Sequence, residues 1–130
     1  MYNGIINLSL YICQMRDFTK YEVWKLGTDF TVQIYYITKS FPDEEKFGIV
    51  SQMRRAAVSI PSNIAEGSSR STEKEFKRFI EISVGSCFEL KTQLMIASRL
   101  GYQFSINVND LLIKLDSIIK QLIALRGTLK

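Results

Sequence analysis

The chain has 130 residues, of which 46% are hydrophobic and 23% charged, and this excludes disordered and collagen-like classes and fits one globular domain. Its 17 basic and 13 acidic side chains give a formal net charge of +4, a mild bias that permits contact with nucleic acid. Histidine is absent, and the two cysteines are far apart in the sequence, so no metal-ligand pattern is present. We therefore expect no metal, no cofactor, no small-molecule substrate and no enzymatic activity, because the commonest general base is also missing.

Residues 1–14 have an apolar centre but lack the positive start and the cleavage site of a secretory signal. They are also too short to span a bilayer. Met15 directly precedes a charged, helix-like sequence, so we expect residues 1–14 to be a flexible or loosely docked extension whose place in the native protein is open. A weak signal peptide is the alternative. We expect residues 15–130 to form the domain, in the cytoplasm and without membrane contact.

The first helix is predicted over residues 21–40, where apolar residues recur three or four apart. This face contains Val23, Leu26, Phe30, Ile34, Ile37 and Phe41. A second line, formed by Trp24, Thr31, Tyr35 and Thr38, widens it. Trp24 and the tyrosines are either a stacking platform for bases or part of the core or a subunit interface, and helical spacing favours the latter. Phe41-Pro42 ends the helix.

The second helix is predicted to begin at Asp43-Glu44-Glu45, since acidic residues stabilise a helix N-terminus. Its inner face contains Phe47, Val50, Ala57, Ile60 and Ile64. Pro61 removes one backbone hydrogen bond, so we expect a kink near Ile60. Gly67-Ser68-Ser69 provides the C-terminal cap and the loop.

The third helix is predicted to start at a capping box formed by Thr72 and Glu75 and to reach Leu100, about 29 residues or about 43 Å. Gly85-Ser86 at its centre has poor helix propensity, and we expect a close helix crossing there to compensate. Asn107 or Asn109 caps the last helix. Four long helices joined by short turns predict an all-α protein, an antiparallel up-down four-helix bundle.

Charged residues among apolar neighbours predict a structural polar network inside the bundle. We expect Arg54 or Arg55 to meet Glu66 or Glu89, with Asn63 nearby. A carboxylate-bridged dimetal site would need Glu-x-x-His pairs, and the absence of histidine argues against it.

Basic residues form candidate phosphate contacts around the second and third helices. Arg70 follows the glycine-serine turn, before a helix N-terminus that can hold an anion, although a simple capped turn is the plainer interpretation. The turn lacks the spacing of a nucleotide-binding P-loop. Lys74, Lys77 and Arg78 share one helix face. The complete candidate nucleic-acid-binding set is Arg54, Arg55, Arg70, Lys74, Lys77 and Arg78.

Several segments together resemble a known bacterial family over about residues 15–128. They are Val23-Trp24-Lys25-Leu26, Phe41-Pro42, residues 52–67 (QMRRAAVSIPSNIAEG), Phe76-Lys77-Arg78-Phe79 and Gly85-Ser86-Cys87-Phe88-Glu89-Leu90. The family comprises small four-helix-bundle proteins encoded in intervening sequences of large-subunit ribosomal RNA genes. The accessory variability determinant of diversity-generating retroelements looks like a relative; it forms a homopentameric ring and binds reverse transcriptase and nucleic acid.

The resemblance implies a four-helix bundle, a ring-like homo-oligomer and a role with RNA or a reverse-transcriptase-like protein, and it implies no enzymatic activity. Function transfers more weakly than fold. The leading hypothesis is a non-enzymatic oligomeric scaffold that binds RNA or a ribonucleoprotein through a moderately basic surface. The alternative is a protein-only interaction module that docks a partner through apolar and aromatic helix faces. The RNA sequence and the physiological partner are not encoded in any motif found here.

Overall fold

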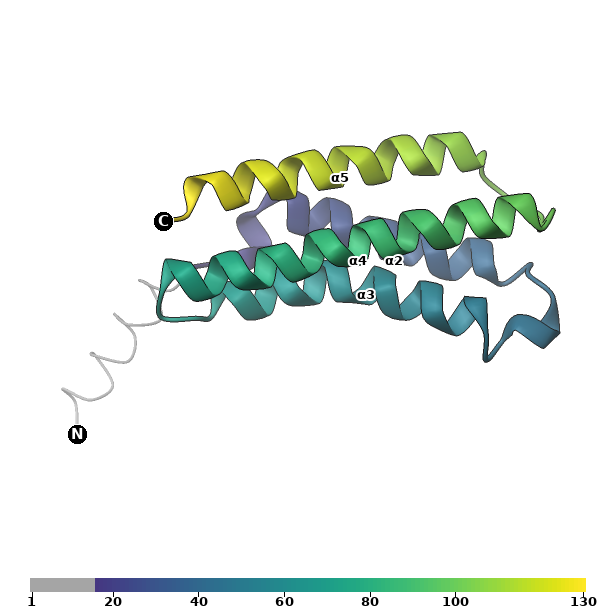
Figure 1. Ribbon diagram of the computed structural model, residues 1–130, viewed down its shortest axis with the longest axis horizontal. Coiled ribbons are helices and arrows are strands. Elements are labelled where there is room, and N and C mark those ends of the chain that lie inside the picture. The colour runs from purple at the N-terminus through teal and green to yellow at the C-terminus, as the bar shows by residue number, and fades with distance from the viewer. Residues whose placement is uncertain (1–15) are drawn as a thin grey trace.

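The computed structural model describes residues 16–130, in which four long helices form an antiparallel up-down bundle (Figure 1). The long helices are α2 (Glu22–Thr38), α3 (Ile49–Ser68), α4 (Glu73–Arg99) and α5 (Val108–Thr128). Two short 3₁₀ helices, η1 (Phe18–Lys20) and η2 (Asp43–Glu45), precede α2 and α3. The predicted fold class is confirmed. The expectations about residues 1–14 and Met15 fall outside the described residues.

The core lies along the centre of the bundle, where every long helix contributes apolar side chains at helical spacing. The helices pack as a ring of neighbours, α2 on α3, α3 on α4, α4 on α5 and α5 on α2. The largest fully buried side chains are Phe30, Ile34, Ile37, Met53, Ile60, Ile64, Phe76, Ile80, Leu90, Leu94, Leu111 and Leu115. No helix among residues 16–130 is both long and apolar enough to cross a bilayer.

The start of the second long helix differs from the prediction. The acids Asp43–Glu45 form the separate turn η2, and α3 begins only at Ile49, because Gly48 takes a non-helical conformation (φ −102°, ψ −119°) between them. Phe47 therefore lies in the connection and is 89% exposed, so its predicted place in the core is wrong. Val50, Ala57, Ile60 and Ile64 are buried as predicted.

Pro61 lies inside α3, which continues unbroken to Ser68; the kink near Ile60 stays a prediction. Proline has no N–H to donate to the carbonyl four residues earlier, which here belongs to Ala57. The Thr31 hydroxyl of α2 donates to that carbonyl oxygen at 2.9 Å. Gly27 faces the same place, since a Cβ there would lie 3.3 Å from Ile60 Cγ2 and 3.7 Å from Pro61 Cδ. At the contact between α2 and α3, Thr31 thus replaces the hydrogen bond that Pro61 cannot make, and Gly27 leaves room for the proline ring.

The helices α3 and α4 approach closely at Gly67, whereas Gly85 itself faces open space. A Cβ at Gly67 would lie 2.6 Å from Phe79 Cβ, whereas a Cβ at Gly85 would meet nothing within 4 Å. The close crossing predicted at Gly85-Ser86 is present beside the glycine, where the Ser83 hydroxyl donates to the Ile60 carbonyl of α3 at 2.9 Å and the Ser86 hydroxyl to the Ser59 hydroxyl at 2.8 Å, but Gly85 itself lies outside the contact. The Thr72 cap is confirmed, because its hydroxyl accepts from the Glu75 N–H at 3.2 Å.

The connection from α4 to α5 closes the end of the bundle near η2. Gly101 has φ +79°, a left-handed conformation that glycine adopts readily after a helix, and Asn107 caps α5. The Tyr102 hydroxyl donates to Glu45 Oε2 at 3.0 Å, which joins the two connections. This hydrogen bond to a carboxylate raises the pKa of Tyr102.

Candidate nucleic-acid interface

Arg54 is directed toward α2, where it caps the last turn of that helix. Its Nε donates to the Thr38 hydroxyl at 3.0 Å, and its Nη2 donates to the Tyr35 carbonyl oxygen at 3.3 Å. The guanidinium lies 4.7 Å from the centroid of the Tyr35 ring. A cation at a helix C-terminus is favourable because the last carbonyl groups carry partial negative charge. Arg54 is therefore half-buried and fixed in place without a carboxylate partner.

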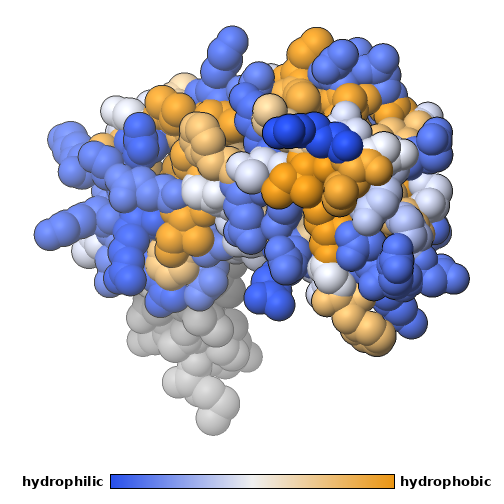
Figure 2. Space-filling model, turned by 45° about the vertical axis from the view of Figure 1, so that its right-hand side comes forward, coloured by the Kyte–Doolittle hydropathy of each residue, from blue (hydrophilic) through white to orange (hydrophobic). Residues whose placement is uncertain are grey.

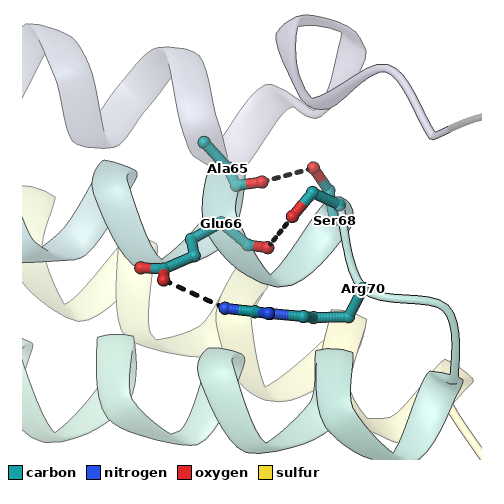
Figure 3. Close-up of polar contacts among 5 residues, drawn as sticks. Ala65, Glu66, Ser68 and Arg70 are labelled. Carbon is teal, nitrogen blue, oxygen red and sulfur yellow. Dashed lines mark hydrogen bonds and ion pairs between the residues drawn. The ribbon is translucent and has the colours of Figure 1, made fainter.

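Glu66 pairs with Arg70 and not with either arginine in the middle of α3. Figure 3 shows the last turn of α3, where Arg70 Nη2 lies 3.1 Å from Glu66 Oε1 and the Ser68 hydroxyl donates to the Ala65 carbonyl at 2.6 Å. The Arg70 guanidinium also lies 4.8 Å from the Phe79 ring centroid. Because the side chains of the ion pair are about half exposed, we expect it to contribute only about 0.3–0.5 kcal/mol.

The other members of the predicted network lie in two separate places. Asn63 Nδ2 donates at 2.8 Å to both the carbonyl and the hydroxyl of Ser59, and the Ser86 hydroxyl of α4 donates to the Ser59 hydroxyl at 2.8 Å. Glu89 is exposed and accepts from Gln93 at 3.3 Å.

The predicted pairing of Arg54 or Arg55 with Glu66 or Glu89 is not formed among the described residues. A neutral Asn63–Ser59–Ser86 contact joins α3 to α4 instead. Sequence reasoning missed this because small serines on a helix indicate close packing without indicating which hydroxyls meet.

A groove of about 640 Å³ lies beside Arg54, between the outer side of α3, the end of α2 and the connection between them. Its lining residues are Tyr35, Lys46, Phe47, Val50, Ser51, Arg54, Arg55, Val58, Ser59 and Ser62. Three of them are cations, and no carboxylate lines the groove. Arg55 is exposed, and Lys46 Nζ lies 5.6 Å from the Phe47 ring centroid. A smaller hollow next to it contains Lys39 and Asp43. The groove is thus apolar, aromatic and positively charged.

The remaining predicted cations gather at the opposite end of α3. Lys74 and Arg78 line a second hollow of about 540 Å³ together with Thr72, Glu75 and Glu81, so its charges are mixed. Lys77 is half-buried. Arg55 and Arg70 are fifteen residues apart on one chain segment that is mostly helical, or about 22 Å. The two connections that flank α3 lie at opposite ends of the bundle (Figure 1). The six predicted residues therefore form two groups, and sequence reasoning missed Lys46 and Phe47 of the first group.

Two groups with possible chemical roles are the acidic side chains and Cys87. Within residues 16–130 no group of three or more His, Cys, Asp or Glu side chains is placed to hold a metal ion. Burial raises the pKa of the Cys87 thiol from 9.0 to about 12, so this cysteine stays protonated and is a poor nucleophile at neutral pH.

A solved structure of another protein has the same fold. A crystal structure of a protein of unknown function from the S23 ribosomal protein family of Bacteroides thetaiotaomicron is similar, with a TM-score of 0.73 and 24% sequence identity. The similarity covers 81% of this chain and 95% of that one, and at this identity it shows the fold alone. No curated protein matches the chain. The model of the 23S rRNA-intervening sequence protein family matches residues 19–124, so the chain belongs to this family.

Proposed function

We propose that the protein is a non-enzymatic oligomeric scaffold that binds RNA, or a ribonucleoprotein partner, through its basic surface in the cytoplasm. The observation that carries the proposal is the groove at the α2–α3 end, where Lys46, Arg54 and Arg55 meet without a carboxylate. Such a field attracts a polyanion, and protein cations contribute to RNA affinity by neutralising phosphates and releasing their counterions. The family description refers to an intervening sequence of 23S rRNA and names no bound ligand, so fragments of 23S rRNA are the first RNAs to test.

The second basic group is a weaker candidate for phosphate contact. Glu73, Glu75 and Glu81 alternate with Lys74, Lys77 and Arg78 along the first turns of α4, so the attraction for a polyanion is partly cancelled. Arg70 is already paired with Glu66. We therefore assign the groove the larger share of binding.

The salt dependence of RNA binding tests the proposal. Fluorescence anisotropy with labelled 23S rRNA fragments, between about 50 and about 200 mM salt, should show log K falling against log salt with a slope of about −2 to −3, as expected for three neutralised phosphates. Lys120→Ala on the exposed side of α5 is the matched control and should leave the slope unchanged. Failure to bind any fragment at low salt would overturn the proposal.

A second candidate function is a protein-only docking module, which the exposed apolar side chains favour. On α2, Val32 and Tyr36 point outward, and Tyr36 is 64% exposed. Trp24, in contrast, is half-buried and packs edge-on against Phe18 at 5.1 Å, so it serves the fold. Apolar docking would change little with salt, so the same titration separates the two functions.

The oligomeric part of the proposal rests on the resemblance to the retroelement accessory protein and on exposed apolar surface. Apolar patches interrupt the hydrophilic surface in Figure 2. Large exposed apolar side chains occur along the outer side of α4, among them Ile82, Phe88, Met95 and Ile96. Contiguous apolar surface on a folded chain commonly marks an interface. A ring-like homopentamer and a reverse-transcriptase-like partner are the specific assemblies we propose.

A further inference from the structure

We propose that the α2–α3 groove binds unpaired nucleotides, with a base stacked on Phe47 and the phosphates held by Arg55 and Lys46. This inference rests on the proposed RNA-binding function and adds the class of ligand, single-stranded rather than duplex RNA. It depends on two features of the groove, an exposed aromatic rim and a set of cations without acids.

Phe47 forms the rim. It lies in the short connection between η2 and α3 and is 89% exposed, and its ring is approached in the described structure by the Lys46 ammonium at 5.6 Å. Burying an apolar side chain is favourable in proportion to the area removed from water, so covering this exposed ring with a ligand lowers the free energy. A nucleobase offers the flat apolar face that such a ring stacks against, whatever the base.

Arg54 and Tyr35 also line the groove. The Arg54 guanidinium lies 4.7 Å from the Tyr35 ring centroid and is held by its hydrogen bonds to α2, so it presents a fixed planar surface. Bases in single-stranded RNA also stack on arginine planes. The groove thus offers two surfaces that suit a planar ligand, the Phe47 ring and the Arg54 guanidinium.

Arg55 is an exposed cation of the groove. It makes no ion pair within residues 16–130, and with Lys46 it can reach phosphate oxygens at the groove mouth. The hydroxyls of Ser51 and Ser62 are exposed beside it as further donors. A volume of about 640 Å³ lies within the range of about 300–1,000 Å³ that is typical of small-ligand clefts. This is room for a short segment of unpaired chain.

Unpaired RNA fits these features better than a duplex or an acidic peptide. In a duplex the base faces are stacked on each other and unavailable to Phe47 or Arg54. A purely acidic peptide such as poly-glutamate satisfies the cations but has no ring to stack on Phe47 or on the Arg54 guanidinium. Charge and shape therefore favour a single strand.

Binding of two RNAs, an unpaired strand and a blunt-ended duplex of the same strand length, tests the inference by fluorescence anisotropy. The intact protein should bind the unpaired RNA more tightly. Phe47→Ala should weaken binding of the unpaired RNA by about 5-fold to about 150-fold, because stacking of one base is worth about 1–3 kcal/mol. The salt slope of this variant should not change, whereas Arg55→Ala should reduce the slope by about 0.7.

The controls are Tyr36→Ala, an exposed aromatic residue of α2 that does not line the groove, and Arg99→Ala, an exposed arginine at the end of α4. Both should bind like the intact protein, and circular dichroism should show that all four variants fold.

Equal affinity for the two RNAs, with no effect of Phe47→Ala, would overturn the inference and leave RNA binding itself standing. Displacement of the unpaired RNA by poly-glutamate at equal charge concentration would also overturn it, in favour of an acidic peptide. If the intact protein binds neither RNA, the proposed function itself is overturned.

Discussion

Two glycines of similar sequence context have opposite structural roles. Gly67 ends α3 in a place where the Phe76 and Phe79 side chains of α4 leave no room for a Cβ. Gly85 lies in the middle of α4 with open space around it. Helix propensity penalises both equally, so only the neighbouring helix distinguishes them.

Alanine substitutions measure this difference. Gly67→Ala should destabilise the fold by about 1–3 kcal/mol, because its Cβ would lie 2.6 Å from Phe79 Cβ and overpack the crossing. Gly85→Ala should stabilise the isolated chain by about 0.5–1 kcal/mol through helix propensity alone. Urea unfolding followed by circular dichroism gives both values. Equal effects of the two substitutions would contradict the assigned crossing.

At the scale of elements, α3 accommodates Pro61 because α2 supplies the missing donor. The Thr31 hydroxyl lies 2.8 Å from the Gly27 carbonyl oxygen and 2.9 Å from that of Ala57, so its single proton is shared between its own helix and α3. An unsatisfied buried carbonyl costs about 1–3 kcal/mol, which makes this one side chain important for the pairing of the two helices.

A double-mutant cycle tests the bridge. Thr31→Val should destabilise the protein by about 1–3 kcal/mol in the presence of Pro61. With Pro61→Ala, the new N–H at position 61 can donate to the Ala57 carbonyl, so the same threonine substitution should cost less. Thr28→Val is the control, since the Thr28 hydroxyl bonds only within α2, to the Trp24 carbonyl. Additive effects of the two substitutions in urea unfolding would refute the bridge.

At the scale of the whole molecule, the exposed apolar side chains of α4 need a physical explanation. Phe88 is 54% exposed, three residues from the open Gly85, on the outer side of the longest helix. Glycine lowers the stability of a helix, and no contact at Gly85 itself offsets this loss within the single chain. Another subunit that packs closely against Gly85 would offset this loss of helix stability.

Light scattering after size exclusion measures the assembly. We expect a mass about five times the 15.0 kDa of the chain, as the resemblance to a homopentameric ring implies. Phe88→Glu should lower the mass toward that of the single chain, because a charge would have to be buried at the contact. Ser98→Glu, at an exposed polar position of the same helix, is the control and should leave the mass unchanged. A mass of 15.0 kDa for the intact protein would contradict the proposed oligomer.

The candidate site was only partly predictable from the sequence. Arg54 and Arg55 were identified because two cations interrupt an otherwise apolar and small-residue helix face, and both line the groove. Lys46 and Phe47 were missed because helical spacing placed Phe47 on the inner face of α3. The break at Gly48 moves it outside the helix. A one-turn error in where a helix begins thus converted a predicted core residue into the most exposed aromatic residue of the groove.

The sequence by itself determined the helices, their order and most of their buried faces, because a period of 3.6 residues and local capping groups are properties of the chain alone. It also determined the family, through long motifs in the right order. Only the tertiary structure decided which polar partners meet. Arg54 reaches the end of α2 rather than a carboxylate, and Ser59 meets Ser86 rather than an ion pair. Such contacts depend on the rotation and height of one helix against another, to within a few ångströms, and local sequence does not fix these.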